Sequence, residues 1–149
     1  MQNDIRHSWF FNQSPEQVWE YLTRAELIAQ WLMKNNFEPV VGHQFQFNTG
    51  PIPSLGLDGI FHCRVLEIVP FSKLAYSWKG GSGNGVTTLD TIVTWTLMPK
   101  DHGTALNLIH SGFKEENAAI FTGMYNGWLE KIEKMTSQLN GSEHANASA

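Results

Sequence analysis

Hydrophobic and polar side chains alternate at every second position through most of the middle of this sequence. The alternation is clearest in three segments, whose inward positions are Leu74, Tyr76 and Trp78, then Val93, Trp95 and Leu97, then Leu106, Leu108 and His110. Successive side chains of a strand point to opposite faces, so each segment predicts a strand with one buried face. Antiparallel strands are therefore expected around 45–47 and over 59–69, 73–79, 90–98 and 103–112.

Three helices are predicted outside this alternating region. Residues 5–11 predict a first strand, and Ser14-Pro15-Glu16-Gln17 then gives a capping serine, a proline at the first helical position and a glutamine that completes a capping box. The sequence Thr23-Arg24-Ala25-Glu26 repeats the capping pattern and predicts a second short helix to about Trp31. From near Asn117, spacings of three and four predict a long helix whose apolar face is formed by Phe121, Met124, Trp128, Ile132, Met135 and Leu139.

The apolar faces of the sheet and of the last helix are expected to meet. Six tryptophans in 149 residues supply large side chains for the space between them. Such rings either pack the space solid or form the wall of a pocket for a hydrophobic molecule. The number of inward rings favours a pocket, and the residues expected to line it are Phe61, Tyr76, Trp78, Trp95, His110, Met124 and Trp128.

Two features of this region have alternative interpretations. His110 shares a strand face with Leu106 and Leu108, so its imidazole is expected inside, held either by a backbone or hydroxyl partner or by a contact to a ligand. Gly123 and Gly127 each cost about 1 kcal/mol relative to alanine in a helix interior. Either close packing against the sheet or space for a ligand would offset that cost.

Glu67 is placed inward if the alternation over 61–65 simply continues. An unpaired buried carboxylate is expensive. A β-bulge near Leu66 is therefore expected, which would turn Leu66 and Ile68 inward and release Glu67 to water.

Composition is typical of a single globular domain. The chain is 42% hydrophobic, and one domain is predicted over 1–139, followed by a small, polar, disordered tail over 140–149. A net charge of −4 without a dense basic patch makes nucleic acid a poor partner. No apolar stretch approaches the roughly 20 residues that span a bilayer, so membrane insertion is not expected. The single cysteine, Cys63, fits a reducing cytosol, and a cytoplasmic protein is predicted.

Motifs for catalysis or metal binding are not found in the sequence. It has no Gly-x-Ser-x-Gly elbow, no dinucleotide fingerprint and no pair of acids at fixed spacing, and its histidines lack the spacing of a zinc site. The glycine-rich segment 80–85 lacks the lysine and the helix start of a phosphate loop, and it predicts a hairpin tip. We therefore predict no catalytic residue, no metal and no cofactor.

Several segments, taken in order along the chain, resemble one family. They are Ser14 to Trp19 with Leu27 and Trp31, Gly59, residues 65–70, 74–78 and 93–97, Gly103-Thr104, residues 110–113 and Gly127-Trp128. Over 5–139 the chain resembles a stand-alone member of the activator of heat-shock protein 90 ATPase homologue-like family, in the START and birch-pollen-allergen (polyketide cyclase-like) superfamily. The resemblance implies an α+β helix-grip fold, in which two short helices follow the first strand. A curved antiparallel sheet of about six strands then wraps around a long C-terminal helix and leaves a cavity.

The function that the resemblance implies is binding of a small hydrophobic molecule, lipid-, flavonoid- or polyketide-like, in that cavity. One alternative is a cyclase- or hydrolase-type enzyme that uses the same cavity, for which His110 and Tyr76 could supply acid-base chemistry. The other is a chaperone-interacting co-regulator of the heat-shock protein 90 type, although the family's eukaryotic namesake has a further N-terminal domain. A monomer or weak dimer is expected.

Overall fold

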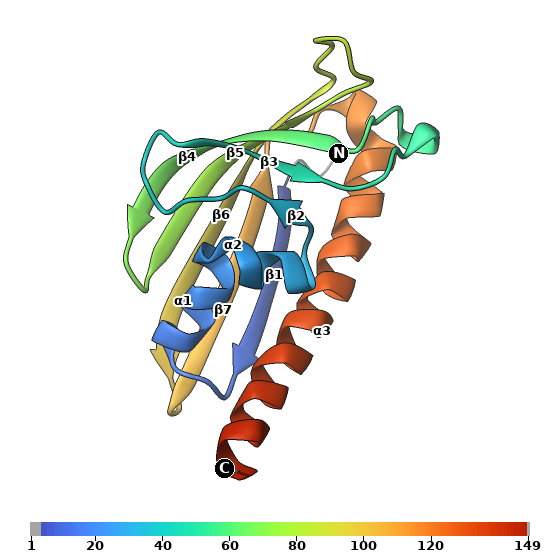
Figure 1. The fold of residues 1–149 in the computed structure, drawn as a ribbon. Helices are drawn as coiled ribbons and strands as arrows, with labels where there is room; N and C mark the ends of the chain where they lie inside the picture. Colours follow the sequence, from blue (N-terminus) through green and yellow to red (C-terminus); the bar gives the residue numbers. More distant parts are fainter. Residues whose placement is uncertain (1–3, 149) are drawn as a thin grey trace.

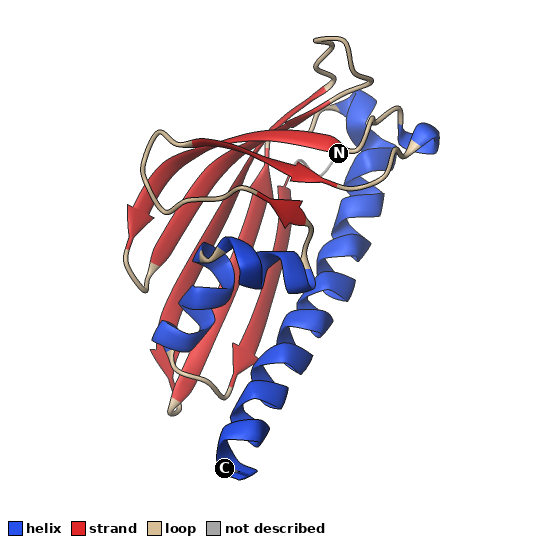
Figure 2. Cartoon of the chain, viewed as in Figure 1, coloured by secondary structure: helices blue, strands red, loops and turns tan. Residues whose placement is uncertain are grey.

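A seven-stranded antiparallel sheet and one long helix make up most of the molecule (Figures 1 and 2). The computed structural model describes the backbone of residues 4–148 and the side chains of residues 4–141. Along the sheet the strands follow the order β1-β7-β6-β5-β4-β3-β2. Their bounds are β1 (Asp4–Phe11), β2 (Lys34–Asn35), β3 (Gln44–Asn48), β4 (Ile60–Val69), β5 (Lys73–Gly80), β6 (Leu89–Lys100) and β7 (Gly103–Ser111).

The helices lie on one side of this curled sheet (Figure 1). They are α1 (Pro15–Thr23), α2 (Ala25–Trp31) and α3 (Ala118–Ser148), with short 3-10 helices η1 (Pro53–Leu55) and η2 (Glu115–Asn117). The predicted inward face of the strands is confirmed, because Trp78, Trp95 and His110 are all at most 1% exposed. The α+β helix-grip fold expected from the sequence is therefore confirmed.

One of the two predicted helix caps is confirmed and the other is wrong. The Gln17 amide donates to Ser14 Oγ at 3.3 Å, and the Ser14 amide donates to Gln17 Oε1 at 3.0 Å, which is the expected capping box. The second helix starts at Ala25, but its N-cap is Arg24, whose side chain makes no capping hydrogen bond. The Thr23 hydroxyl instead donates to the carbonyl of Trp19 at 2.8 Å, because that carbonyl is within reach in its own helix.

The expected strand count of about six is one short of the seven observed. The missed strand is β2, which pairs with the end of β3 through Lys34 and Asn35. A two-residue strand cannot show an alternating pattern, so the sequence carries no signal for it.

The bulge predicted near Leu66 is confirmed by a register shift between Val65 and Glu67 in the β4–β5 pairing. Glu67 is exposed, as expected, and its carboxylate lies 3.0 Å from Lys73 Nζ. Ile68 packs against the core. The inward turn expected of Leu66 is wrong, because this side chain is 43% exposed: the extra residue of a bulge is left out of the alternation.

The last helix is longer than its apolar face. The sequence ends that face at Leu139, which is buried, whereas α3 continues as backbone helix to Ser148. The disorder of the polar tail over 140–149 stays a prediction, and its last residue lies outside the described residues.

We expect Ser14→Ala to lower the free energy of unfolding by about 0.5–2 kcal/mol, because it removes the acceptor for an N-terminal amide of α1. Urea denaturation measures the change. Ser137→Ala, at an exposed position of α3, is the matched control and should stay within about 0.5 kcal/mol of the wild type. Equal effects of the two substitutions would contradict the capping role.

Candidate functional site

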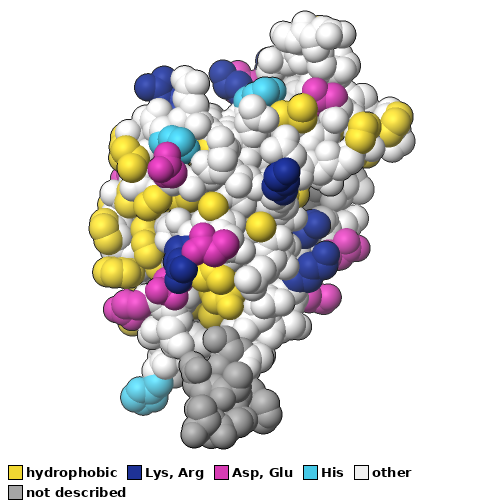
Figure 3. All heavy atoms as spheres, in the orientation of Figure 1, with side chains coloured by type: hydrophobic (Ala, Val, Ile, Leu, Met, Phe, Trp, Pro, Cys, Tyr) yellow, Lys and Arg dark blue, Asp and Glu magenta, His cyan; other side chains and the backbone are white. Residues whose placement is uncertain are grey.

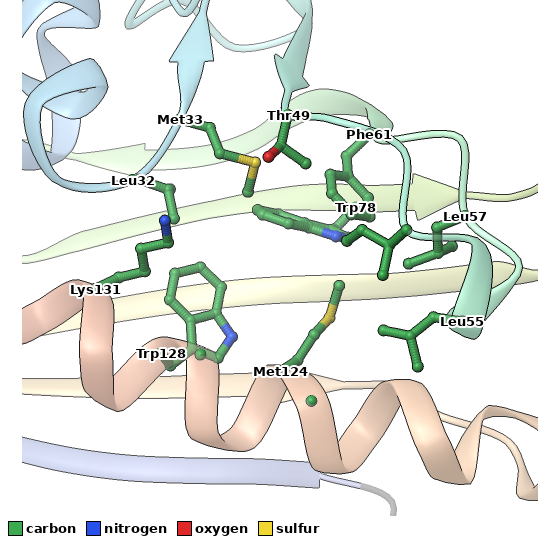
Figure 4. Close-up of a pocket in the computed structure, with 13 residues that line it drawn as sticks. Leu32, Met33, Thr49, Leu55, Leu57, Phe61, Trp78, Met124, Trp128 and Lys131 are labelled. Carbon is green, nitrogen blue, oxygen red and sulfur yellow. The ribbon is translucent and has the colours of Figure 1, made fainter.

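A cavity of about 270 Å³ lies between the sheet and α3 (Figure 4). Its walls come from β4, β5, α3, the residues after α2 and the segment 49–57 that contains η1. The lining residues are Leu32, Met33, Thr49, Ile52, Leu55, Leu57, Phe61, Trp78, Gly123, Met124, Gly127, Trp128 and Lys131. This apolar lining is typical of small-molecule sites, and the volume is close to the lower end of their usual range of roughly 300–1,000 Å³.

The two glycines of α3 face this cavity and leave it open. A Cβ atom placed on Gly127 would have no neighbouring atom within 4 Å, and one placed on Gly123 would meet Leu55 Cδ1 at 3.5 Å, an ordinary contact. Neither glycine is therefore needed for close approach of the helix to the sheet. Of the two interpretations that the sequence left open, the structure favours space over close packing.

His110 ties α3 to the sheet through both nitrogens of its imidazole. The indole N–H of Trp128 donates to His110 Nδ1 at 3.1 Å, and His110 Nε2 lies 2.8 Å from Thr91 Oγ1. The Thr91 hydroxyl donates in turn to the carbonyl of Trp78 at 2.8 Å. Because an indole N–H can only donate, Nδ1 must accept and the ring proton must be on Nε2, facing Thr91. We call this chain of three hydrogen bonds the His110 relay.

The relay requires a neutral imidazole. Burial lowers the pKa of His110 from its ordinary value of 6.5 to about 3. A second proton would have to sit on Nδ1, where it would face the N–H of Trp128. The structural role weighed for His110 is thus supported by a hydroxyl partner, and neither of its nitrogens is free to exchange a proton with a ligand.

The seven residues that the sequence predicted for a binding site separate into two groups. Four of them line the cavity: Phe61, Trp78, Met124 and Trp128. The other three are buried in the packed interior and do not line the cavity: Tyr76, Trp95 and His110.

Aromatic packing accounts for this separation. The ring of Trp31 lies 6.0 Å from that of Trp95, and Phe45 lies 5.4 Å from Tyr76, so rings from α2 and β3 fill this part of the interior. Trp95 Nε1 also donates to the Tyr76 hydroxyl at 3.0 Å. The polar atoms of this pair are thus satisfied within the core, and burial raises the pKa of Tyr76.

Other lining residues were missed by the sequence analysis. Ile52, Leu55 and Leu57 come from a segment without hydrophobic periodicity, so no pattern predicted where it would fold. Lys131 was not included in the apolar face predicted for the last helix, because its side chain is charged. Its spacing of three from Trp128 and four from Gly127 was the available signal, because residues at those spacings share a helix face.

Trp78 brings an unpaired polar group to the wall of the cavity. Its side chain is 1% exposed, and its indole nitrogen has no hydrogen-bond partner among the described residues. Leaving a buried donor unsatisfied costs about 1–3 kcal/mol, so such groups are uncommon in folded proteins.

The part of the chain with described side chains holds no cluster of three or more His, Cys, Asp or Glu residues that could bind a metal ion. Over the same residues, no helix combines the length and the hydropathy that a membrane crossing needs.

Comparison with known proteins gives a consistent family assignment. Residues 12–140 match the family described as "Activator of Hsp90 ATPase homolog 1-like protein". The crystal structure of MLL2253 from Mesorhizobium loti is 32% identical with a TM-score of 0.82, over 93% of this chain and 97% of that chain. No curated protein matches the sequence.

Two more distant structures share the fold. DynU16, encoded in the dynemicin biosynthetic locus, is 21% identical with a TM-score of 0.74, over 94% of this chain and 48% of that chain. The Aha1 dimer from Colwellia psychrerythraea is 17% identical with a TM-score of 0.75, over 93% of this chain and 96% of that chain. The family match and the similarity to MLL2253 show that this chain belongs to the activator of Hsp90 ATPase homolog 1-like family.

We expect His110 to stay neutral as the pH is lowered from about 8 to about 5. Its pKa in the folded protein is about 3, and in the unfolded chain it is near 6.5. The unfolded chain therefore binds the extra proton first. The stability that neutral His110 contributes is complete above about pH 6.5 and is lost as the pH falls toward 3, by at most about 1.4 kcal/mol per pH unit.

Nitrogen-15 NMR of the imidazole checks this directly, with an Nε2-protonated signature expected throughout. His110→Phe is the control for stability, because phenylalanine cannot be protonated. Between about pH 6.5 and pH 5 the free energy of unfolding of this variant should therefore fall less than that of the wild type. Protonation of His110 near pH 6 in the folded protein would show that the relay does not exist as described.

Proposed function

We propose that this protein binds a small hydrophobic molecule in the cavity between the sheet and α3. The observation that carries the proposal is the open space at Gly127, where an added Cβ would have no described atom within 4 Å. Glycine at this position destabilises the helix by about 1 kcal/mol relative to alanine, and no close contact with the sheet accounts for it. The side chains of Phe61, Met124 and Trp128 make the wall of the cavity apolar. Transfer of an apolar ligand from water into such a site is therefore favourable.

The ligand class that best fits is compact and lipid-, flavonoid- or polyketide-like. A volume of about 270 Å³ suits a small molecule. The thioether side chains of Met33 and Met124 are flexible and can adapt to ligands of different shape.

The side chains that line the cavity favour ligand binding over catalysis. The two residues named for acid-base work, Tyr76 and His110, do not line the cavity, and both are hydrogen-bonded inside the core. Among the described lining residues Lys131 is the only one with an ionisable side chain. A cyclase or hydrolase would need a proton donor and acceptor beside the substrate.

A protein-interaction role is the second candidate, and an exposed apolar surface favours it. Leu66, Val69 and Phe71 are 43%, 44% and 46% exposed at and beside the β4–β5 turn. Figure 3 shows hydrophobic side chains gathered on that side of the molecule. A partner such as a chaperone would dock on this patch, away from the cavity, so the two roles are separable by mutation.

The setting proposed for the protein is the cytoplasm, as a monomer or weak dimer. Cys63 is a free, buried thiol, and burial raises its pKa, so it is poorly reactive. That state suits a reducing compartment. The Aha1 structure from Colwellia psychrerythraea is described as a dimer, which makes weak self-association a reasonable expectation here.

We expect Gly127→Leu to block binding without destabilising the fold. The leucine side chain would enter the open space and exclude a ligand, while the helix would gain up to about 1 kcal/mol from the loss of glycine. N-phenyl-1-naphthylamine, a neutral fluorescent probe, is the test ligand. Its affinity should fall roughly tenfold or more, with an unchanged or higher melting temperature.

Gly141→Leu is the matched control, because Gly141 lies on the same helix, is exposed and has no atom within 4 Å of an added Cβ. It should leave probe affinity unchanged. Lost stability with intact affinity in Gly127→Leu would place the binding site elsewhere. Failure of the wild type to bind any apolar probe would remove the proposal.

A further inference from the structure

Among the described residues that line the cavity, Lys131 alone has a charged side chain. Figure 4 shows it beside Leu32 at one end of the cavity, with Leu55 and Leu57 at the other. The side chain is half-buried. A lysine in such a position packs its methylene stem against apolar groups and keeps its ammonium group toward water.

The ammonium group of Lys131 forms no salt bridge with any residue whose side chain is described. Its neighbours one helical turn away are Gly127, Trp128, Lys134 and Met135, and none of them is acidic. Burial, followed by the charge of Lys134, lowers the pKa of Lys131, and the adjacent Glu130 only partly offsets this.

The remaining polar groups of the wall are also mainly donors. The indole N–H of Trp78 has no acceptor among the described residues, whereas that of Trp128 is already bonded to His110. Thr49 contributes a hydroxyl, and none of the described residues brings a carboxylate to the cavity. A ligand that carries acceptor atoms is therefore matched to this wall, and one that carries a positive charge is not.

We propose that the ligand is an apolar acid, with an aromatic or aliphatic body in the cavity and a carboxylate, sulfonate or similar anionic group paired with Lys131. This inference rests on the proposed function, because it names the chemical class of ligand for the same cavity. An anionic group beside Lys131 would supply the ion-pair partner that the described residues do not, at a half-buried position where water is partly excluded.

Two fluorescent probes with the same ring system test this inference. N-phenyl-1-naphthylamine is neutral, and 1-anilinonaphthalene-8-sulfonate adds one sulfonate to it. Lys131→Met keeps most of the length of the side chain and removes its charge. Lys134→Met is the matched control, since Lys134 is exposed on the same helix and does not line the cavity.

We expect Lys131→Met to lower the affinity for the sulfonate probe alone. Lys131→Met should lower the affinity for the sulfonate probe about three- to tenfold and change the affinity for the neutral probe by no more than about twofold. Lys134→Met should change the affinity for either probe by no more than about twofold. Lys131→Arg should keep most of the affinity for the sulfonate probe. A higher salt concentration should lower the affinity of the wild type for the sulfonate probe and have little effect on the affinity of Lys131→Met.

Three outcomes are distinguishable. If both probes bind and Lys131→Met weakens them equally or not at all, the anionic ligand class is wrong and the cavity proposal stands. If Lys134→Met has the same selective effect as Lys131→Met, the attraction is a property of the surface charge and the pairing is wrong. If neither probe binds the wild type, the proposed function itself fails.

Discussion

The hydrogen bonds of the His110 relay determine how far α3 lies from the sheet, and the cavity depends on that spacing. Trp128 on α3 donates to His110 on β7, which pairs with Thr91 on β6, whose hydroxyl reaches the Trp78 carbonyl on β5. The relay joins one helix to three neighbouring strands through side chains that are almost fully buried. Each donor has one acceptor, so a shift of the helix would leave buried polar groups unpaired. The large rings of Trp78 and Trp128 then act as spacers, with centroids 5.6 Å apart.

The interior is packed on one side of this relay and open on the other. On the side of Tyr76 and Trp95, rings from α2 and β3 fill the space, and the polar atoms bond to one another. On the other side α3 presents Gly123 and Gly127. A Cβ added there would meet only Leu55 Cδ1 at Gly123, and no described atom within 4 Å at Gly127. The packed half contributes close ring contacts and internal hydrogen bonds to stability, and the open half leaves room for the proposed ligand. A binding protein of this size needs both, because every side chain removed from the core to make room also removes stabilising contacts.

The fold could be predicted from the sequence because period-two alternation and helical spacing are strong local signals. They placed the inward faces at Trp78, Trp95 and His110, and a costly buried carboxylate predicted the bulge before Glu67. The binding site could be predicted only in part. Facing inward is a property of one residue, whereas lining a cavity depends on which other chain segment fills the neighbouring space. Tyr76 faces inward and is covered by Phe45, and the wall around Ile52 belongs to a segment without a periodic pattern.

The central claim is that a ligand enters between the sheet and α3, and an NMR titration with N-phenyl-1-naphthylamine tests it most directly. Four signals report on the cavity wall: the indole N–H groups of Trp78 and Trp128 and the backbone amides of Gly123 and Gly127. All four signals are expected to shift together along one binding curve, while the indole signal of Trp95, in the packed half, shifts less. Shifts confined to the hairpin tip over 80–85, or to the exposed surface around Phe71, with the four cavity signals unchanged, would contradict it.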